Sequence, residues 1–388
     1  MKTTIQEVDL YTQLMESAER IGKLAEAENQ SAEENSTISQ AVVDLIKSEG
    51  IHHLIKPKEY GHPQISFNTY TDMIRKVGYY NLSAAWLTYF YSLHNSWVAY
   101  LPKHRMDEVY GTGGLIADIF PPIGKATKVE GGFRISGHWK FVSGINYSEW
   151  VGVGALYFSN EGEPPAHIAF CVHRNDFKLI KEWDSLGLRG SGSNTIIIED
   201  LFVPDDMVLN FNEIIQRRKP HPLEVDEDYL YYNVSFFPAF FVGFPAMALG
   251  AAERVIDEYR ERTKKRVRIG GQTASESPTA QRVLAEMTLK YQAASGMMRE
   301  YIDMLNSDEG QYPHAVYNGI RVQIIQNCMD IAVRATLAFG AGSLAKGNPL
   351  EVMLRDLTAI ATHITSLYED GLEHYGKHLF GFDTLSRG

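Results

Sequence analysis

A chain of 388 residues is long for one compact core, so two or three domains or layers are expected. The formal net charge of −11 argues against sequence-independent nucleic-acid binding, which needs clustered Lys and Arg. The N-terminus lacks the apolar core of a signal peptide, and no uncharged apolar run reaches the ~18 residues that span a membrane. We therefore expect a cytoplasmic protein without membrane contact. Cys171 and Cys328 lie far apart, so neither a disulfide framework nor a metal site is expected.

The first part of the chain is predicted to be helical. Apolar residues recur at helical spacing in residues 5–27 and 38–46, and another helix is expected to start near Asn68. Residues 82–100 read as one long helix that buries a broad aromatic face. Residues recurring at four-residue intervals on that helix are Trp86, Phe90, His94 and Val98. This pattern predicts an N-terminal helical domain of residues 1–113.

From Gly114 the pattern changes to short β-prone runs separated by Gly, Pro, Asn and Asp. It predicts a central β-barrel or sandwich in residues 114–210. A charged linker with prolines follows at residues 217–227, and residues 228–388 are predicted to form a C-terminal four-helix bundle. The expected helices are residues 231–265, 275–305, 312–339 and 349–375. The predicted fold class is therefore α+β with several domains.

One hairpin presents the first candidate site residue. A Gly-Gly turn at residues 131–132 is followed by alternating apolar residues, which put one aromatic face inward. The alternating residues are Phe133, Ile135, Trp139 and Phe141. The return strand ends at Ser143 beside a glycine, where a hydroxyl can lie edge-on against a flat ligand. A buried serine without such a ligand needs a backbone acceptor instead.

Two glycine-rich stretches look like dinucleotide motifs but fail as such. Residues 340–345 lie between two predicted helices without a preceding strand, so a helix break is preferred. The second stretch, residues 187–193, also fails, because the third glycine of the motif would fall just beyond it at position 195, which is Thr195. This second stretch is rich in amides and hydroxyls and suits an anion or a polar ring edge, with a purely structural turn as the alternative.

The hairpin ending at Ser143, the run at residues 183–193 and the flanking helical blocks together resemble the acyl-CoA dehydrogenase superfamily, and more closely its flavin-dependent monooxygenase branch. The resemblance covers nearly the whole chain. It implies the three-part fold predicted above and a flavin, FMN or FAD. The flavin would arrive reduced from a separate NAD(P)H:flavin reductase, because no NAD(P)H module is readable here. It also implies a homotetramer built as a dimer of dimers.

The resemblance also implies roles for individual residues. Ser143 is similar to the family serine or threonine that meets flavin N5 and, in monooxygenases, helps to hold the C4a-hydroperoxide. Arg266 resembles the family arginine that reaches the flavin phosphate across a subunit interface, although Ile269 replaces the aromatic residue of that pattern. A basic, solvated helix end is the alternative for this cluster. Further residues expected to bind the cofactor are Trp139, Phe141, Arg189, Ser191 and Ser193.

His363 is the second catalytic candidate. Dehydrogenases of the common subtype carry a glutamate base soon after an Arg-Asp pair, and here that position falls on Ile364, which cannot take a proton. Monooxygenase relatives have a histidine there, near the flavin. We expect His363 to share one helix face with Asp356 and Ala359, because they are seven and four residues away. An ordinary interior histidine is the alternative.

His94 is the third catalytic candidate. It falls on the aromatic face of its predicted helix, where burial favours the neutral imidazole. A neutral histidine facing a pocket can accept a phenol proton. Relatives place a His-x-Trp arrangement near this point, whereas this chain has His-x-x-Trp. Asp118 stands near a substrate-contacting serine of such relatives, and we expect it to contact the substrate together with Phe120. If Asp118 faces the pocket, an amine or a more polar ring than a simple phenol is expected.

The expected function is the oxygenase component of a two-component flavin-dependent monooxygenase. It would use reduced flavin and O2, through a C4a-hydroperoxyflavin, to hydroxylate an aromatic or other electron-rich small molecule. Two alternatives stay open. An acyl-CoA dehydrogenase or oxidase would need another base, for which Glu369 and Asp370 are candidates. A non-catalytic, flavin-free member of the fold is the other.

Overall fold

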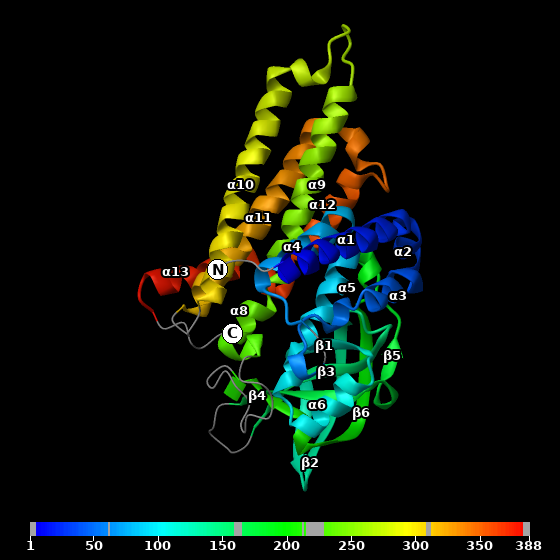
Figure 1. The fold of residues 1–388 in the computed structure, drawn as a ribbon, viewed down its shortest axis with the longest axis vertical. Helices are drawn as coiled ribbons and strands as arrows, with labels where there is room; N and C mark the ends of the chain where they lie inside the picture. Colours follow the sequence, from blue (N-terminus) through cyan, green and yellow to red (C-terminus); the bar gives the residue numbers. More distant parts are fainter. Residues whose placement is uncertain are drawn as a thin grey trace.

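The computed structural model describes residues 5–60, 63–158, 165–211, 213–214, 229–307 and 312–382. Helices in the first and last parts of the chain flank a central run of strands, and this confirms the predicted α+β class. In Figure 1 the sheet lies at one end of the long axis, the long C-terminal helices extend to the other end, and N-terminal helices lie between them. The linker predicted at residues 217–227 lies outside the described residues.

The N-terminal helices place a short aromatic helix at the centre of the molecule. They are α1 (Ile5–Ala27), α2 (Asn29–Asn35), α3 (Gln40–Ser48), α4 (Phe67–Tyr80), α5 (Leu82–Ser92) and α6 (Lys103–Gly111). Helix α5 begins where the Asn81 side chain accepts a hydrogen bond from Ala84 N, at 2.8 Å, as an N-cap does. All eleven of its residues are buried. It contacts the sheet, the bundle helices and the turn η5 (Arg189–Ser191), so its side chains reach all three regions.

The prediction of one helix over residues 82–100 was wrong. Helix α5 ends at Ser92, and the 3₁₀ helix η3 (His94–Tyr100) follows. The Asn95 side chain donates to Tyr91 O at 2.9 Å, and this amide takes the carbonyl that a continuing helix would pair with a backbone N–H. Ser96 N instead donates to Leu93 O, three residues earlier. The break turns His94 toward the sheet.

The strands form one seven-stranded sheet in the order β5-β6-β2-β1-β3-β4-β7. Their bounds are β1 (Leu115–Val129), β2 (Gly132–Val142), β3 (Ser148–Tyr157), β4 (Ala166–His173), β5 (Lys178–Ile180), β6 (Asn194–Pro204) and β7 (Val208–Asn210). Neighbouring strands are antiparallel except β1 and β3, which are parallel. Strand β2 lies between β6 and β1, so its C-terminal end meets both the β6 entry turn and helix α5.

The hairpin prediction was right for Trp139 and wrong for Phe141. Trp139 is fully buried, whereas Phe141 is 65% exposed. Between Trp139 and Val142, strand β2 advances three residues while β6 advances two, and Phe141 has a φ of +65°. This bulge reverses the side-chain alternation, so Phe141 points outward and the next buried residue is Val142.

The C-terminal part contains α8 (Phe236–Phe240), α9 (Gly243–Lys265), α10 (Pro278–Asn306), α11 (His314–Phe339), α12 (Pro349–Ala361) and α13 (Tyr368–Leu379). The long helices α9, α10 and α11 run along the axis of Figure 1. Part of Phe236–Lys265 is apolar enough to cross a membrane, but 83% of that apolar window is buried inside the protein, as in a core helix.

The helix predicted over residues 349–375 is also interrupted. Helix α12 ends at Ala361, and the 3₁₀ turn η10 (Ile364–Ser366) separates it from α13. Thr362 Oγ1 donates back to Thr358 O at 2.9 Å, and His363 is extended, with ψ of 140°. His363 therefore does not continue the helix face of Asp356 and Ala359, as had been expected.

Candidate active site

A chain of buried hydroxyls lies where strand β2 ends. Ser143 Oγ is 2.9 Å from Ser193 Oγ, and Ser193 Oγ is 2.8 Å from Ser191 Oγ. The indole of Trp86 on α5 donates to Ser143 Oγ at 2.9 Å. All three serines are buried. The predicted hairpin serine and both serines of the glycine-rich turn are thus brought together, and Trp86 connects them to α5.

The donor count of this cluster fits a polar-edged ligand such as a flavin. Each serine carries one hydroxyl proton, and the two inter-serine bonds use two of the three. Within the described residues, one hydroxyl proton of the three serines is therefore left for an external acceptor. An isoalloxazine edge carries ring nitrogens and carbonyls that accept such a bond. Ser143, Ser191 and Ser193 could therefore hold it.

The glycines of residues 187–192 are used for packing. A Cβ at Gly187 would lie 2.1 Å from Arg355 O, and one at Gly190 would lie 2.9 Å from Ser83 Cβ. The turn is fixed to α12 because Asp356 Oδ1 accepts from Leu188 N at 2.7 Å. Burial raises the pKa of Asp356 to about 7. The glycines therefore serve the structural turn that was the alternative interpretation, while the serines of the turn make the polar contacts.

Arg189 and Arg355 complete the anchoring of this turn. Arg189 Nη1 donates to Ser185 O at 2.7 Å and pairs with Asp184 Oδ1 at 2.6 Å. Arg355 Nη2 pairs with Glu33 at 2.6 Å, and its Nη1 donates to Leu186 O. In the single chain, the guanidinium of Arg189 is thus engaged with the turn and with Glu33 O on α2 rather than with the serine cluster.

His94 and Asp118 form a buried pair beneath α5. His94 Nδ1 lies 2.7 Å from Asp118 Oδ2, and both side chains are almost fully buried. Burial raises the pKa of Asp118, and the facing His94 opposes that shift. A carboxylate beside Nδ1 selects the tautomer in which Nδ1 carries the proton, so Nε2 is the acceptor. His94 Nε2 is buried and has no hydrogen-bond partner among the described residues.

Aromatic rings surround the imidazole of His94. The ring centroid of Phe240 stacks on it at 3.9 Å, and that of Phe90 lies at 4.0 Å. Tyr89 contacts it edge-on at 4.5 Å. Phe120, predicted to contact substrate, is two residues from Asp118 on β1 and has its ring 5.8 Å from Phe240. The predicted residues His94, Asp118 and Phe120 therefore share one apolar surrounding.

His363 lies on the other side of the same aromatic set. Its ring is 5.3 Å from that of Trp86 and 5.0 Å from that of Phe244. Loss of solvation, reinforced by the positive charge of Arg321, lowers the pKa of His363 to about 4. Its Nδ1 accepts from Thr365 N at 3.4 Å and lies 2.9 Å from Thr365 Oγ1. The neutral ring then carries its proton on Nε2, so His363 is a donor where His94 is an acceptor.

Three predicted cofactor residues lie outside this cluster in the single chain. Trp139 is fully buried in the sheet, and its indole donates to Gly154 O at 2.9 Å. Phe141 is exposed and contacts the Trp183 ring edge-on at 6.0 Å. Arg266 is exposed at the end of α9, where it donates to Phe339 O at 3.3 Å. Their cofactor roles stay predictions.

Comparisons with known proteins agree with this geometry. The acyl-CoA dehydrogenase C-terminal domain family matches residues 242–366. The oxygenase subunit HsaA of a flavin-dependent monooxygenase from Rhodococcus jostii is 26% identical over 91% of this chain and 94% of its own. The oxygenase component of p-hydroxyphenylacetate 3-hydroxylase from Acinetobacter baumannii is 23% identical over 97% of this chain and 90% of its own.

The fold comparison extends over the whole molecule. The structure of XiaF from Streptomyces, in complex with FADH2 and glycerol, superposes with a TM-score of 0.89, at 23% identity, over 98% of each chain. The fold is that of the acyl-CoA dehydrogenases. In sequence, the two relatives named above are an oxygenase subunit of a flavin-dependent monooxygenase and the oxygenase component of a hydroxylase, and this similarity agrees with the sequence resemblance.

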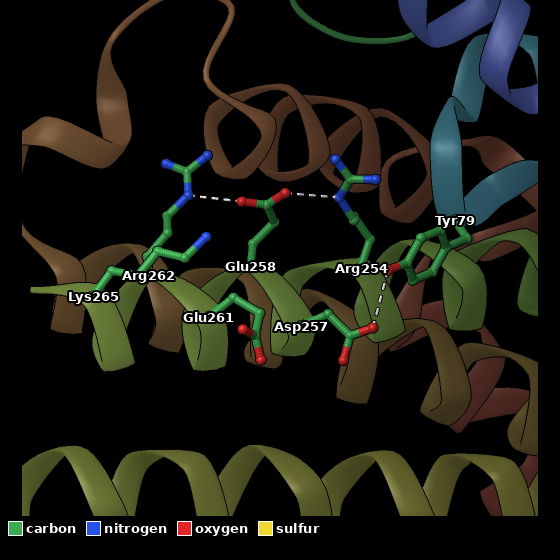
Figure 2. A pocket seen from close by; sticks show the side chains of 7 residues that line it. All are labelled: Tyr79, Arg254, Asp257, Glu258, Glu261, Arg262 and Lys265. Carbon is green, nitrogen blue, oxygen red and sulfur yellow. Dashed lines mark hydrogen bonds and ion pairs between the residues drawn. The ribbon is translucent and has the colours of Figure 1, made fainter. Parts of the chain in front are cut away.

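Two surface grooves lie away from the buried cluster. One of about 300 Å³ lies between α4 and α9. Figure 2 shows its side chains engaged with one another: Glu258 lies between Arg254 and Arg262, and Tyr79 donates to Asp257. A second groove of about 570 Å³ lies between α10 and α11. Because the first groove is internally paired, we do not place the chemistry there.

Sequence reasoning missed three residues of the site. Trp86 had been assigned only to the buried face of its helix, although its indole N–H bonds Ser143. Phe244 was hidden in the apolar run that begins α9. Arg321 is the one arginine in the strongly apolar first half of α11, and this isolation was a usable signal.

Proposed function

We propose that this protein is the oxygenase component of a two-component flavin-dependent monooxygenase, which hydroxylates an aromatic or other electron-rich small molecule. The observation that carries the proposal is that Trp86 contacts both predicted catalytic groups. It donates to Ser143 at 2.9 Å and packs edge-on against His363 at 5.3 Å. A serine at a strand end and an imidazole from the far side of the bundle therefore border one aromatic surrounding.

Reduced flavin, when bound, supplies the electrons that activate O2 for transfer of one oxygen atom to the substrate. Ser143, Ser191 and Ser193 would hold its polar edge through the hydroxyl proton that their mutual bonds leave over. The flavin is FMN or FAD, delivered in reduced form by a separate NAD(P)H:flavin reductase. Burial of the three serines keeps water from competing for that hydrogen bond.

The two histidines act on the substrate and oxygen side. His94 Nε2, held as an acceptor by the Asp118 contact at 2.7 Å, takes a hydrogen bond from a substrate hydroxyl or ring N–H and can remove that proton. His363, neutral at pH 7 because its pKa is lowered to about 4, presents an Nε2–H donor. The aromatic rings between them exclude water from both groups.

The dehydrogenase alternative has no base in the right place. Ile364 is an exposed isoleucine, and the candidate carboxylates Glu369 and Asp370 lie exposed in the first turn of α13. No observation of the described residues favours abstraction of a proton from an acyl thioester.

The proposal is tested by isotope incorporation. The protein, an unrelated NADH:FMN reductase, FMN and ¹⁸O2 are incubated with a panel of phenols and indoles, and products are analysed by mass spectrometry. We expect one ¹⁸O atom in the product of at least one probe and none when the protein is omitted. If every probe is returned unlabelled while FMN is turned over, the hydroxylase assignment fails.

A further inference from the structure

A buried arginine on α11 has no role in the chemistry described so far. Arg321 is 4% exposed. Its Nε and Nη2 both donate to Thr365 O, at 3.1 and 2.7 Å. These two bonds hold the η10 turn that follows His363, so part of the guanidinium has a plain structural use. The guanidinium carries five N–H donors, and these bonds engage only two of them.

The charge of the guanidinium is only partly compensated by the protein. Nη1 is buried and has no hydrogen-bond partner among the described residues, and none of their carboxylates forms an ion pair with Arg321. The Tyr301 hydroxyl donates its own proton to Pro238 O at 2.7 Å, and its oxygen forms a neutral hydrogen bond with the guanidinium. The Phe241 ring lies 5.0 Å from Arg321 Cζ. A cation over one ring recovers only part of the cost of burying a charge.

Arg321 adjoins the proposed site. Burial lowers the pKa of Arg321, opposed in part by Tyr301 and Tyr89, and the Tyr89 ring contacts His94 at 4.5 Å. The charge of Arg321 contributes to the lowered pKa of His363. Phe241, under the guanidinium, contacts Phe244 at 6.1 Å, and Phe244 in turn contacts His363 at 5.0 Å. Arg321 thus borders the same aromatic set as both histidines.

A second unpartnered donor lies next to the arginine. Ser366 Oγ, on the residue after Thr365, is 2% exposed and has no hydrogen-bond partner among the described residues. A guanidinium edge and a hydroxyl are the groups that bind a carboxylate together. On the His94 side, the unpartnered atom Nε2 is an acceptor. The unpartnered buried groups are therefore donors at the Arg321 end of the aromatic set and an acceptor at the His94 end.

We propose that Arg321, assisted by Ser366, binds a small oxyanionic group of the substrate, a carboxylate, while His94 Nε2 receives the hydroxyl or ring N–H at the substrate's other end. The substrate class is thus an aromatic acid with a hydrogen-bond donor on its ring. This inference rests on the proposed function for the site but concerns binding alone. The phosphate of the flavin is the other source of an oxyanion, and the test separates the two.

The test compares matched acids and alcohols by calorimetric titration into flavin-free protein. The probes are 4-hydroxybenzoate, 4-hydroxyphenylacetate and 3-(4-hydroxyphenyl)propanoate, each beside the alcohol of the same length. One acid is expected to bind wild type roughly 10- to 150-fold more tightly than its alcohol, as hydrogen bonds to a charged group imply. Arg321→Met should bring that ratio close to one and leave alcohol binding unchanged. Arg321→Lys should give an intermediate ratio. Arg299→Met, on the surface of α10, is the matched control and should keep the wild-type ratio.

Equal affinity of wild type for each acid and its alcohol would overturn the proposal, whether or not the protein transfers oxygen. If Arg321→Met instead weakens FMN but not riboflavin, the oxyanion is the flavin phosphate and the substrate assignment is wrong. Should Arg321→Met fail to fold, as judged by circular dichroism, the ratio is measured in Arg321→Lys and Ser366→Ala. An unchanged ratio in both variants refutes the proposal that Arg321 and Ser366 bind a substrate carboxylate.

Discussion

His94 and His363 border the same aromatic rings but differ in hydrogen-bonding character. Asp118 at 2.7 Å fixes the proton of His94 on Nδ1, whereas Thr365 N donates to His363 Nδ1 and leaves the proton of that ring on Nε2. A site with one neutral acceptor and one neutral donor can take a substrate proton at one end and steady an oxygen atom at the other. Which residue types can do this is readable from sequence, but the tautomers follow only from their neighbours.

The pairing of Asp118 with His94 gives a prediction for catalysis. In Asp118→Asn the hydrogen bond at Nδ1 can persist, but the negative charge that strengthens His94 as a base is lost. We expect the hydroxylation rate to fall at least about tenfold. Steady-state product formation measures this rate. Asp107→Asn, on the surface of α6, is the control. A wild-type rate in Asp118→Asn would contradict the role given to Asp118.

The depressed pKa of His363 predicts a pH-dependent stability. The pKa is about 4 in the folded protein and about 6.5 in an unfolded chain. The unfolded state therefore binds more protons between these values, and the free energy of unfolding falls as pH drops from 6.5 toward 4, by at most about 1.4 kcal/mol per pH unit. Above 6.5 the contribution is fully present.

His363→Gln should show a shallower fall over that range in urea titrations at fixed pH values. His138→Gln changes an exposed histidine of β2 and serves as the control, which should match wild type. If His363→Gln loses stability with acid as steeply as wild type does, the inference that His363 stays neutral in the folded protein is wrong.

At the scale of elements, the site forms where regular structure stops. Ser143 follows the end of β2, His94 opens η3 after α5 ends, and His363 follows α12. Periodicity located each of these segments, because apolar spacing marks the faces that pack. Two helices predicted from periodicity extended beyond their real ends. Side-chain hydrogen bonds from Asn95 and Thr362 to backbone carbonyls accompany these ends, and such bonds leave no periodic pattern in the sequence. Phe141 was misplaced by a bulge for the same reason.

The bond between Asp356 and the serine turn yields a prediction at this scale. The pKa of Asp356 is about 7 in the folded protein and about 3.9 when unfolded, so the folded state binds more protons between these values. The free energy of unfolding therefore falls as pH rises from about 4 to 7, and the loss is complete above 7. Asp356→Asn keeps an acceptor for Leu188 N without a titrating group.

We expect Asp356→Asn to gain stability relative to wild type at pH 8, and to lose that advantage at pH 5. Thermal unfolding at the two pH values measures the difference. A constant difference between variant and wild type across pH would show that Asp356 does not titrate in this range.

At the scale of the whole molecule, the order of helices, strands and helices was predictable because each class has its own period, and the resemblance added the fold. Arg321 and Ser366 were not found: the isolation of Arg321 among apolar residues was a usable signal for the arginine, but no local pattern shows that a buried donor has no partner. The assembly is a further level: Arg266 is exposed in the single chain, near the end of α9. We propose a homotetramer in which this arginine reaches the flavin phosphate of a neighbouring subunit.

Arg266→Glu tests that assembly. Replacing the cation by an anion should weaken FMN binding about tenfold or more and leave riboflavin binding unchanged, because only FMN carries a phosphate. Light scattering with size-exclusion chromatography should give the mass of four chains for wild type. Lys264→Glu, two residues away and paired with Glu261, is the control. A monomeric wild type that binds FMN, with affinity unaffected by Arg266→Glu, would contradict the proposed assembly.

The central claim is that the serine cluster and the two histidines hold reduced flavin in a site without water. There, an oxygen atom is transferred to the substrate rather than released as hydrogen peroxide. Its most direct test mixes anaerobic reduced FMN and an excess of protein with oxygenated buffer, without substrate, and follows hydrogen peroxide with time. We predict that wild type delays peroxide release relative to free reduced FMN, and that Ser143→Ala, which removes the acceptor of the Trp86 indole, shortens the delay at least about tenfold. Peroxide release from wild type at the rate of free flavin would contradict the account.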